Sequence, residues 1–141
     1  MKRVVLDTNV LVQAAIGSKA ASGRVIDRYW AGDFETSFSP DTLTELLEAL
    51  TLPQIRERHG WSDDEILAFV AALQANATLH RPTHSVPPSV TRDVTDAKFL
   101  ALAEEINADY LVTNDRRHLL RLGQYHETRI VTPGQFLNEY A

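Results

Sequence analysis

Residues 4–12 read Val4-Val5-Leu6-Asp7-Thr8-Asn9-Val10-Leu11-Val12. The apolar run ends at Asp7, and the residues after it follow a helix-like pattern. In an open α/β sheet, buried strands end in this way, and ligands bind beyond their carboxyl ends. The stretch therefore predicts a strand followed by a helix, with the carboxylate of Asp7 at the ligand-binding edge of a sheet.

The rest of the chain alternates between strand-like and helix-like segments. The most regular helical patterns cover Ser62 to Asn76 and Ala97 to Asn107. Strands separated by helices imply parallel pairing through crossover helices, so we expect an α/β fold, a three-layer α/β/α sandwich with a central, mostly parallel sheet. The expected strands are Arg3 to Leu6, Phe34 to Phe38, Thr78 to Arg81, Tyr110 to Thr113 and Arg129 to Val131.

Between the second and third of these strands the chain is helical from Thr42 to Asn76, with a break at Pro53. This pattern predicts a helical hairpin that projects from the sheet. Ser62 and Glu65 form a capping-box signature at the start of its last helix. Loops are expected where Gly and Pro punctuate the sequence: Gly17 to Gly23, His59-Gly60 and Pro82 to Arg92.

Length and composition set the broad class. The 141 residues suffice for one full core, so we expect one domain over residues 1–141. Apolar residues make up 44% and charged residues 23%, which argues against a disordered or fibrous chain. The absence of cysteine excludes disulfides and thiolate zinc sites. The first apolar run stops at Asp7, too early for a signal peptide, and nothing predicts a membrane span, so we expect a cytoplasmic protein.

Four acidic residues occupy comparable positions near the ends of strands or in the helices that follow them. They are Asp7, Glu45, Asp96 and Asp115. Carboxylates that converge without nearby bases favour a hard divalent cation such as Mg²⁺ or Mn²⁺. Such a centre can activate a water molecule for in-line cleavage of a phosphodiester. The net charge of −5 would normally disfavour a polyanionic partner, but cations bound at four acids would remove most of that objection.

Each acid also has an ordinary structural interpretation. Asp7 is a common residue type for a helix N-cap, and Glu45 is the kind of helix acid that is usually just solvated. Asp93, Thr95 and Asp96 compete for one helix cap. Asn-Asp, as at residues 114–115, is common turn chemistry. The histidines show no metal-ligand spacing such as HExxH.

Five motifs follow one another along the chain: Asp7 to Val12, Leu43 to Leu46, Asp93 to Ala103, Ala108 to Asp115, and Ile130 to Leu137. In this order they resemble the PIN-domain ribonucleases, and most closely the toxin components of prokaryotic toxin–antitoxin systems that are similar to VapC toxins. The resemblance covers essentially the whole chain. It implies a single PIN-like nuclease domain.

The resemblance implies a Mg²⁺- or Mn²⁺-dependent endoribonuclease that cleaves single-stranded RNA with a metal-activated water. It also implies a homodimer and a cognate antitoxin that holds the enzyme inactive. By the resemblance, the catalytic and metal-binding residues are Asp7, Glu45, Asp96 and Asp115, and the accessory residues are Asn9, Asp93 and Thr113.

The chain departs from the family pattern in three places. The motif often written Asp-Pro-Asp-Asp reads Asp93-Val94-Thr95-Asp96, and the usual Thr-Gly-Asp reads Thr113-Asn114-Asp115. A further acid, found in many relatives three residues later, is replaced by His118. The four principal carboxylates remain, while the affinity of a second metal ion and any contribution of Asp93 stay open.

RNA binding requires cations along the path of the phosphates. We expect this role for Arg92, Lys98, Arg116 and Arg117, close in sequence to Asp96 or Asp115. The alternative is a solvated surface that balances nearby acids, and Lys98 either faces the site or pairs with one of them. The apolar helical hairpin around Leu43 to Leu73 is a candidate surface for an antitoxin segment.

Two other enzyme or signalling classes also place acids at strand ends. A haloacid-dehalogenase-type phosphatase needs a second Asp two residues after the first, where Asn9 stands. A receiver domain needs paired acids after the first strand and a Lys on a late strand, and the sequence has neither. The alternative that stays open is a PIN-like RNA- or protein-binding module with weak or no nuclease activity.

Overall fold

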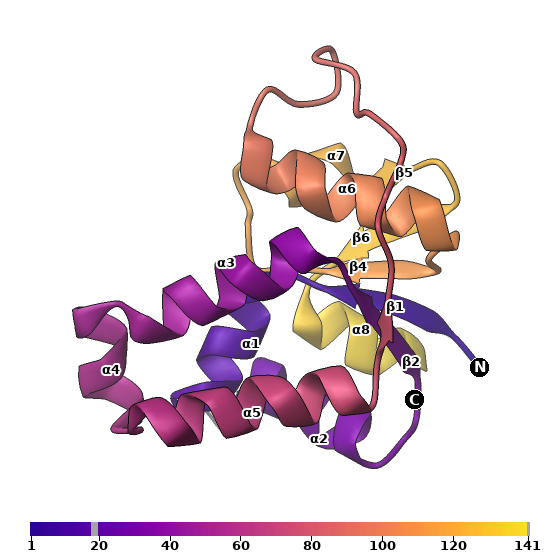
Figure 1. The fold of residues 1–141 in the computed structure, drawn as a ribbon. Coiled ribbons are helices and arrows are strands. Elements are labelled where there is room, and N and C mark those ends of the chain that lie inside the picture. Colours follow the sequence, from indigo (N-terminus) through magenta and orange to yellow (C-terminus); the bar gives the residue numbers. More distant parts are fainter. Residues whose placement is uncertain (18–19, 141) are drawn as a thin grey trace.

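A central sheet organises the structure, a computed structural model that describes residues 1–17 and 20–140. In this part of the chain the sheet has six strands in the order β3-β2-β1-β4-β6-β5 (Figure 1). Every pairing is parallel except that of β5 with β6. The strands are β1 (Arg3–Leu6), β2 (Glu35–Phe38), β3 (Thr78–Leu79), β4 (Tyr110–Val112), β5 (Gln124–Tyr125) and β6 (Thr128–Val131).

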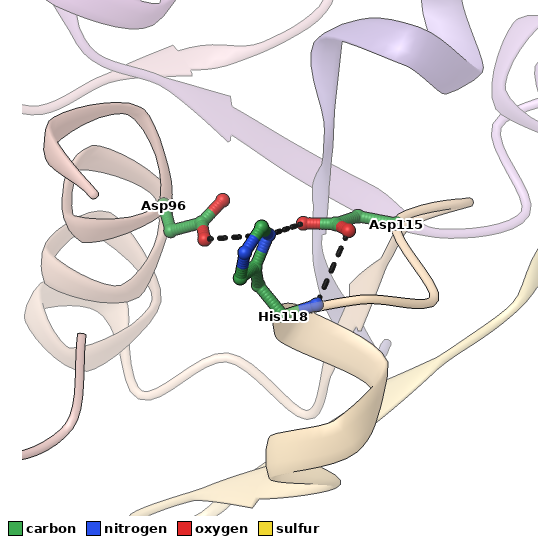
Figure 2. Close-up of side chains that lie close together, drawn as sticks. All are labelled: Asp96, Asp115 and His118. Atoms are coloured by element: carbon green, nitrogen blue, oxygen red, sulfur yellow. Dashed lines mark hydrogen bonds and ion pairs between the residues drawn. The ribbon is translucent and has the colours of Figure 1, made fainter. Parts of the chain in front are cut away.

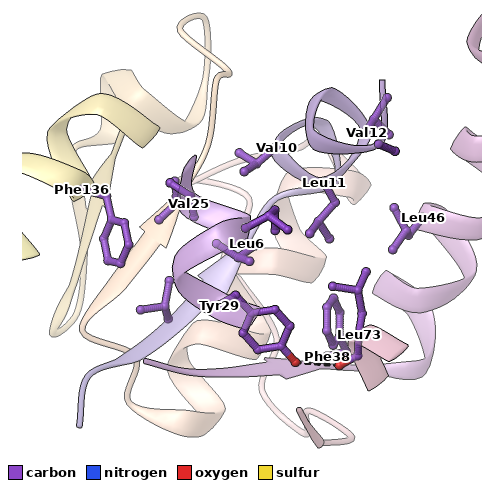
Figure 3. Packing of buried hydrophobic residues seen from close by; sticks show 14 of the residues in the cluster. Leu6, Val10, Leu11, Val12, Val25, Tyr29, Phe38, Leu46, Leu73 and Phe136 are labelled. Atoms are coloured by element: carbon purple, nitrogen blue, oxygen red, sulfur yellow. Dashed lines mark hydrogen bonds between the residues drawn. The ribbon is translucent and has the colours of Figure 1, made fainter. Parts of the chain in front are cut away.

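Helices cover both faces of the sheet, which confirms the three-layer α/β/α prediction. Alternate residues of β1 point to opposite faces, so Val4 and Leu6 join one buried cluster and Val5 joins the other. Figure 3 shows the larger cluster, to which α1 (Thr8–Ala15), α2 (Ala21–Trp30), α3 (Pro40–Thr51), α5 (Asp63–Ala75) and α8 (Pro133–Tyr140) contribute. On the other face lie α6 (Val94–Ile106) and α7 (Leu119–Leu122).

The predicted helical hairpin is present as a helical arm formed by α3, α4 (Pro53–His59) and α5, and it extends away from the sheet (Figure 1). Pro53 begins α4, where its missing amide hydrogen costs nothing. Gly60 ends α4 in the left-handed conformation, with φ of 69°. The capping box of Ser62 and Glu65 opens α5 as predicted. The arm thus starts and stops where its capping residues and its proline indicate.

Several predicted segments differ from the structure, among them the strand expected at Thr78 to Arg81, which ends at Leu79. The expected loop from Gly17 to Gly23 is partly wrong, because residues 21–23 already belong to α2, and residues 18 and 19 lie outside the described residues. Burial of Val25 and Ile26 outweighs the low helix propensity of Gly and Ser there. The helix expected at Ala97 begins at Val94 instead. Strand β5 was not predicted, since two residues are too few to show alternation.

The order of the strands creates a crevice at the carboxyl end of β1. Strand β1 lies between β2 and β4, so the chain leaves it toward one side and returns on the other. Leu6 is in register with Val112, and the backbone N–H of Asp7 donates to the carbonyl of Val112 over 2.9 Å. This is the topological switch point at which α/β sheets bind ligands. Among the described residues, no helix is long and apolar enough to cross a membrane.

Candidate metal centre

The four predicted carboxylates meet in one cavity of about 520 Å³ at this switch point. Thr8, Asn9 and Thr95 also line the cavity, as do apolar residues of the helical arm. The acids come from four separate parts of the chain: Asp7 after β1, Glu45 on α3, Asp96 on α6 and Asp115 after β4. The parallel topology therefore brings together side chains that lie up to 108 positions apart.

Asp7 is buried, with 6% of its surface exposed. Its side chain makes no capping hydrogen bond to α1 but accepts one from the Thr113 hydroxyl over 2.6 Å. Burial is the main cause that raises the pKa of Asp7 to about 6, and the neighbouring carboxylates of Glu45 and Asp96 add to the rise. The hydrogen bonds from the Thr113 hydroxyl and the Thr8 backbone act in the opposite direction. Capping therefore does not account for this carboxylate.

The side chain of Asp96 does not cap a helix either. The side chain of Asp93 caps α6 instead, accepting hydrogen bonds from the backbone amides of Thr95 (2.8 Å) and Asp96 (3.1 Å). Asp96 is 6% exposed, and its Oδ2 is buried without a hydrogen-bond partner among the described residues. Burial, with the carboxylates of Asp93 and Asp115, raises the pKa of Asp96 to about 6.

Asp115 lies in the turn after β4, where backbone groups fix it. Its amide donates to the Thr113 hydroxyl over 2.9 Å, and its Oδ1 accepts from the amides of Arg117 and His118. Its Oδ2 lies 3.5 Å from Nδ1 of His118. The same nitrogen is 3.9 Å from Oδ2 of Asp96, so the imidazole stands between the two carboxylates (Figure 2).

Asp96, Asp115 and His118 offer one ligand atom each, and these atoms all lie within 4.8 Å of one another. His118 was not predicted as a ligand, because the histidines lack HExxH-type spacing. The available signal was the position of His118, three residues after Asp115 in the same turn. Asp7 and Glu45 line the same cavity but are not members of this compact group.

The predicted accessory residues Asn9 and Thr113 hold the cavity walls together, as does Thr8, which was not predicted. The Thr8 hydroxyl donates to Oε2 of Glu45 over 2.9 Å, which joins α1 to α3. Oδ1 of Asn9 accepts from the amide of Asn114 over 3.3 Å, which joins α1 to the turn after β4. Thr113 connects Asp7 to Asp115 through the two hydrogen bonds already described. The polar positions thus orient the acids relative to one another.

The donor set fits a hard divalent cation. Buried carboxylates close to one another repel, and burial without a counter-charge is unfavourable for each of them. A cation bound by these carboxylates would offset the burial that raises the pKa values of Asp7 and Asp96 and would give the unpartnered Oδ2 of Asp96 a partner. Carboxylate oxygens are the ligands that Mg²⁺ and Mn²⁺ take.

The four predicted RNA-binding cations are divided between different surfaces. Arg116 and Arg117 are exposed in the turn beside Asp115. Arg92 lines a second cavity of about 400 Å³, which shares Asp96 with the first one. Lys98 is half-buried and lines a separate hollow with Asp41 and His84, so the structure does not place it in the cavity with the acids.

Known proteins match this chain both in sequence and in fold. Residues 3–117 match the PIN domain family. An uncharacterized protein of Methanocaldococcus jannaschii, MJ1680, is 26% identical over 145 residues, which cover 98% of this chain and 91% of that protein. The solved structure of FitAB bound to an IR36 DNA fragment superposes with a TM-score of 0.51 at 14% identity, over 92% of this chain and 94% of that chain.

Proposed function

Because the chain belongs to the PIN domain family, we propose that it is a metal-dependent endoribonuclease that cleaves single-stranded RNA with Mg²⁺ or Mn²⁺. In this proposal residues 1–141 form a single nuclease domain. The observation that carries it is the buried Oδ2 of Asp96, which has no hydrogen-bond partner among the described residues, in a residue that lines one cavity with three further carboxylates. An ionised carboxylate in this setting is stabilised by a bound cation.

The four acids hold the cation in the proposed mechanism, and their neighbours hold the acids. A bound Mg²⁺ or Mn²⁺ lowers the pKa of a coordinated water and offsets negative charge on a phosphodiester. Thr113 fixes Asp7, Thr8 fixes Glu45, and the turn amides fix Asp115. The carboxylates are thereby arranged before the substrate arrives, which limits reorganisation during the reaction.

The exposed cations beside the cavity supply the attraction for RNA. Arg116 and Arg117 follow Asp115 directly, so a phosphate backbone that reaches the acids passes them. These contacts are electrostatic and carry no base specificity, which suits a substrate held by its backbone. Arg92 lines the second cavity, which shares Asp96 with the first one.

The proposal includes a role as the toxin of a toxin–antitoxin pair, with a homodimer as its assembly. Ala49, Leu52 and Ile55 of the helical arm line the cavity that holds the acids. An antitoxin segment bound against the arm would therefore obstruct access to the carboxylates. Leu52 and Leu67 of the arm and Trp30 of α2 are exposed large apolar residues, as expected of surfaces that bind protein partners.

The test is cleavage of a labelled pool of single-stranded RNA by the purified protein with Mg²⁺, with Mn²⁺ and with excess chelator. We expect cleavage with the metal ions, none with chelator, and none by Asp7→Asn, whose fold is checked by circular dichroism. Asp27→Asn changes an exposed acid on α2 and is the matched control. RNA binding without cleavage under every metal condition would refute the nuclease and favour the binding module.

A further inference from the structure

His118 contributes a nitrogen atom to an otherwise oxygen-only group. Its backbone amide donates to Oδ1 of Asp115 over 3.3 Å, which fixes the start of the side chain beside that carboxylate. Its ring then turns Nδ1 toward Oδ2 of Asp115 and Oδ2 of Asp96 (Figure 2). The imidazole bridges one half-buried acid and one fully buried acid.

The distances from Nδ1 of His118 to the two carboxylate oxygens suit joint binding of one metal ion better than direct hydrogen bonds. Protein N–H···O bonds span about 2.7–3.2 Å, whereas Nδ1 lies 3.5 Å from Asp115 and 3.9 Å from Asp96. Two ligands that each lie about 2.1 Å from one metal ion are about 3.0–3.4 Å apart at cis or tetrahedral angles. The separation from Asp115 is close to this range, and a small rotation of the largely exposed imidazole closes the rest toward Asp96.

His118 lies within ion-pair distance of both carboxylates, but an ion pair alone does not explain the arrangement. If protonated His118 served only to neutralise Asp96, its N–H would donate to Oδ2 of that residue. The structure instead leaves this buried oxygen without a hydrogen-bond partner among the described residues. Nδ1 of His118 is directed at this oxygen but is too far away to form a hydrogen bond with it. A metal ion can therefore lie between the two atoms.

We propose that His118 is a ligand of the metal centre, with Asp96 and Asp115, and that it makes the site prefer a divalent transition-metal ion such as Mn²⁺ over Mg²⁺. Imidazole suits first-row transition metals, while Mg²⁺ takes oxygen ligands and water. The inference rests on the proposed function, since it concerns the cation of the same centre. Beyond the proposed function, it identifies His118 as the residue that selects the ion.

The first experiment measures metal affinity without using catalysis. Mn²⁺ and Mg²⁺ are titrated calorimetrically into the parent, His118→Ala, His118→Asp and His84→Ala. His84 is the matched control, because it also lies beside a carboxylate, with Nδ1 3.1 Å from Glu104. We expect His118→Ala to lose about tenfold or more in Mn²⁺ affinity, a loss typical of impaired metal-site residues. His118→Asp should restore Mg²⁺ binding but not the preference for Mn²⁺, and His84→Ala should match the parent.

The second experiment detects the bond itself. Pulsed electron paramagnetic resonance of the Mn²⁺-loaded protein reports the ¹⁴N coupling of a directly bonded imidazole, which proximity alone does not produce. We expect this coupling in the parent and in His84→Ala, and its loss in His118→Ala. Circular dichroism checks that each variant is folded.

The outcomes separate this inference from the proposed function. If the parent binds neither ion, the metal centre itself is wrong and the nuclease proposal fails with it. If the parent binds Mn²⁺ without ¹⁴N coupling, and His118→Ala binds it equally well, the role of His118 is refuted while the nuclease proposal stands. Equal affinity of the parent for Mg²⁺ and Mn²⁺ also refutes the proposed preference.

Discussion

Asp7→Asn should stabilise the metal-free protein at neutral and alkaline pH. Burial raises the pKa of Asp7 from 3.8 to about 6, and each pKa unit corresponds to about 1.4 kcal/mol. The ionised carboxylate thus lowers the free energy of unfolding by about 3 kcal/mol. Asp7 accepts hydrogen bonds from the Thr113 hydroxyl and from the Thr8 backbone, whereas an amide accepts through one oxygen only, so the variant loses a hydrogen bond worth about 1 kcal/mol. The expected net gain is about 2 kcal/mol.

The gain has a defined pH dependence. A folded-state pKa above the unfolded value means that the stability contributed by protonated Asp7 is complete below about pH 4 and is lost as the pH rises through about 6. The advantage of Asp7→Asn should therefore be full at about pH 8 and small or absent at about pH 4. It reflects relief of an unfavourable buried charge.

Urea unfolding with chelator, followed by circular dichroism at both pH values, measures this difference. Asp27→Asn, an exposed acid, should show no such gain. With excess Mn²⁺ the order should reverse, because ligand binding stabilises only the protein that keeps its site. A variant less stable than the parent at about pH 8 in chelator, or a gain equal at both pH values, would refute the reasoning.

Three further predictions concern single contacts. Tyr29→Phe removes a 2.6 Å hydrogen bond from the buried hydroxyl to the carbonyl of Leu73, so the free energy of unfolding should fall by about 1–3 kcal/mol in urea titrations, and an unchanged value would contradict the assigned contact. Asp93→Ala removes the cap of α6 and should lower the unfolding free energy by about 1 kcal/mol, while Mn²⁺ affinity in calorimetry changes little; a large loss of affinity would show that Asp93 is a ligand after all. The double variant Arg116→Ala with Arg117→Ala should reduce the slope of the logarithm of the RNA-binding constant against the logarithm of the salt concentration by about 1.4. Fluorescence anisotropy with single-stranded RNA in chelator measures this slope, and an unaltered slope would exclude both residues from the RNA path.

The fold could be predicted because its signals are local and repeated. The apolar run Val4-Val5-Leu6 predicts a buried strand from Arg3 to Leu6, and β1 covers those residues. The capping box of Ser62 and the break at Pro53 mark helix ends that the structure keeps. Strand β5 could not be predicted, because a strand of two residues is defined only by its pairing with β6.

The candidate site could be predicted only in part. Strand ends indicated where Asp7 and Asp115 lie, because parallel strands deliver their carboxyl ends to one edge. Which acid caps α6 could not be chosen, since Asp93 and Asp96 are both suitable and only the surrounding packing buries Asp96. The sequence does not give the direction in which a helical side chain points. Lys98 was therefore expected near Asp96, but it lines another hollow.

The edges of the sheet bear on how copies of this chain associate. The outermost strands, β3 and β5, are two residues long, and β5 folds back antiparallel on β6. A flat, unprotected border recruits further strands and leads to fibrous aggregation. Borders this short give a neighbouring molecule little to extend, which limits growth into strand-paired fibres.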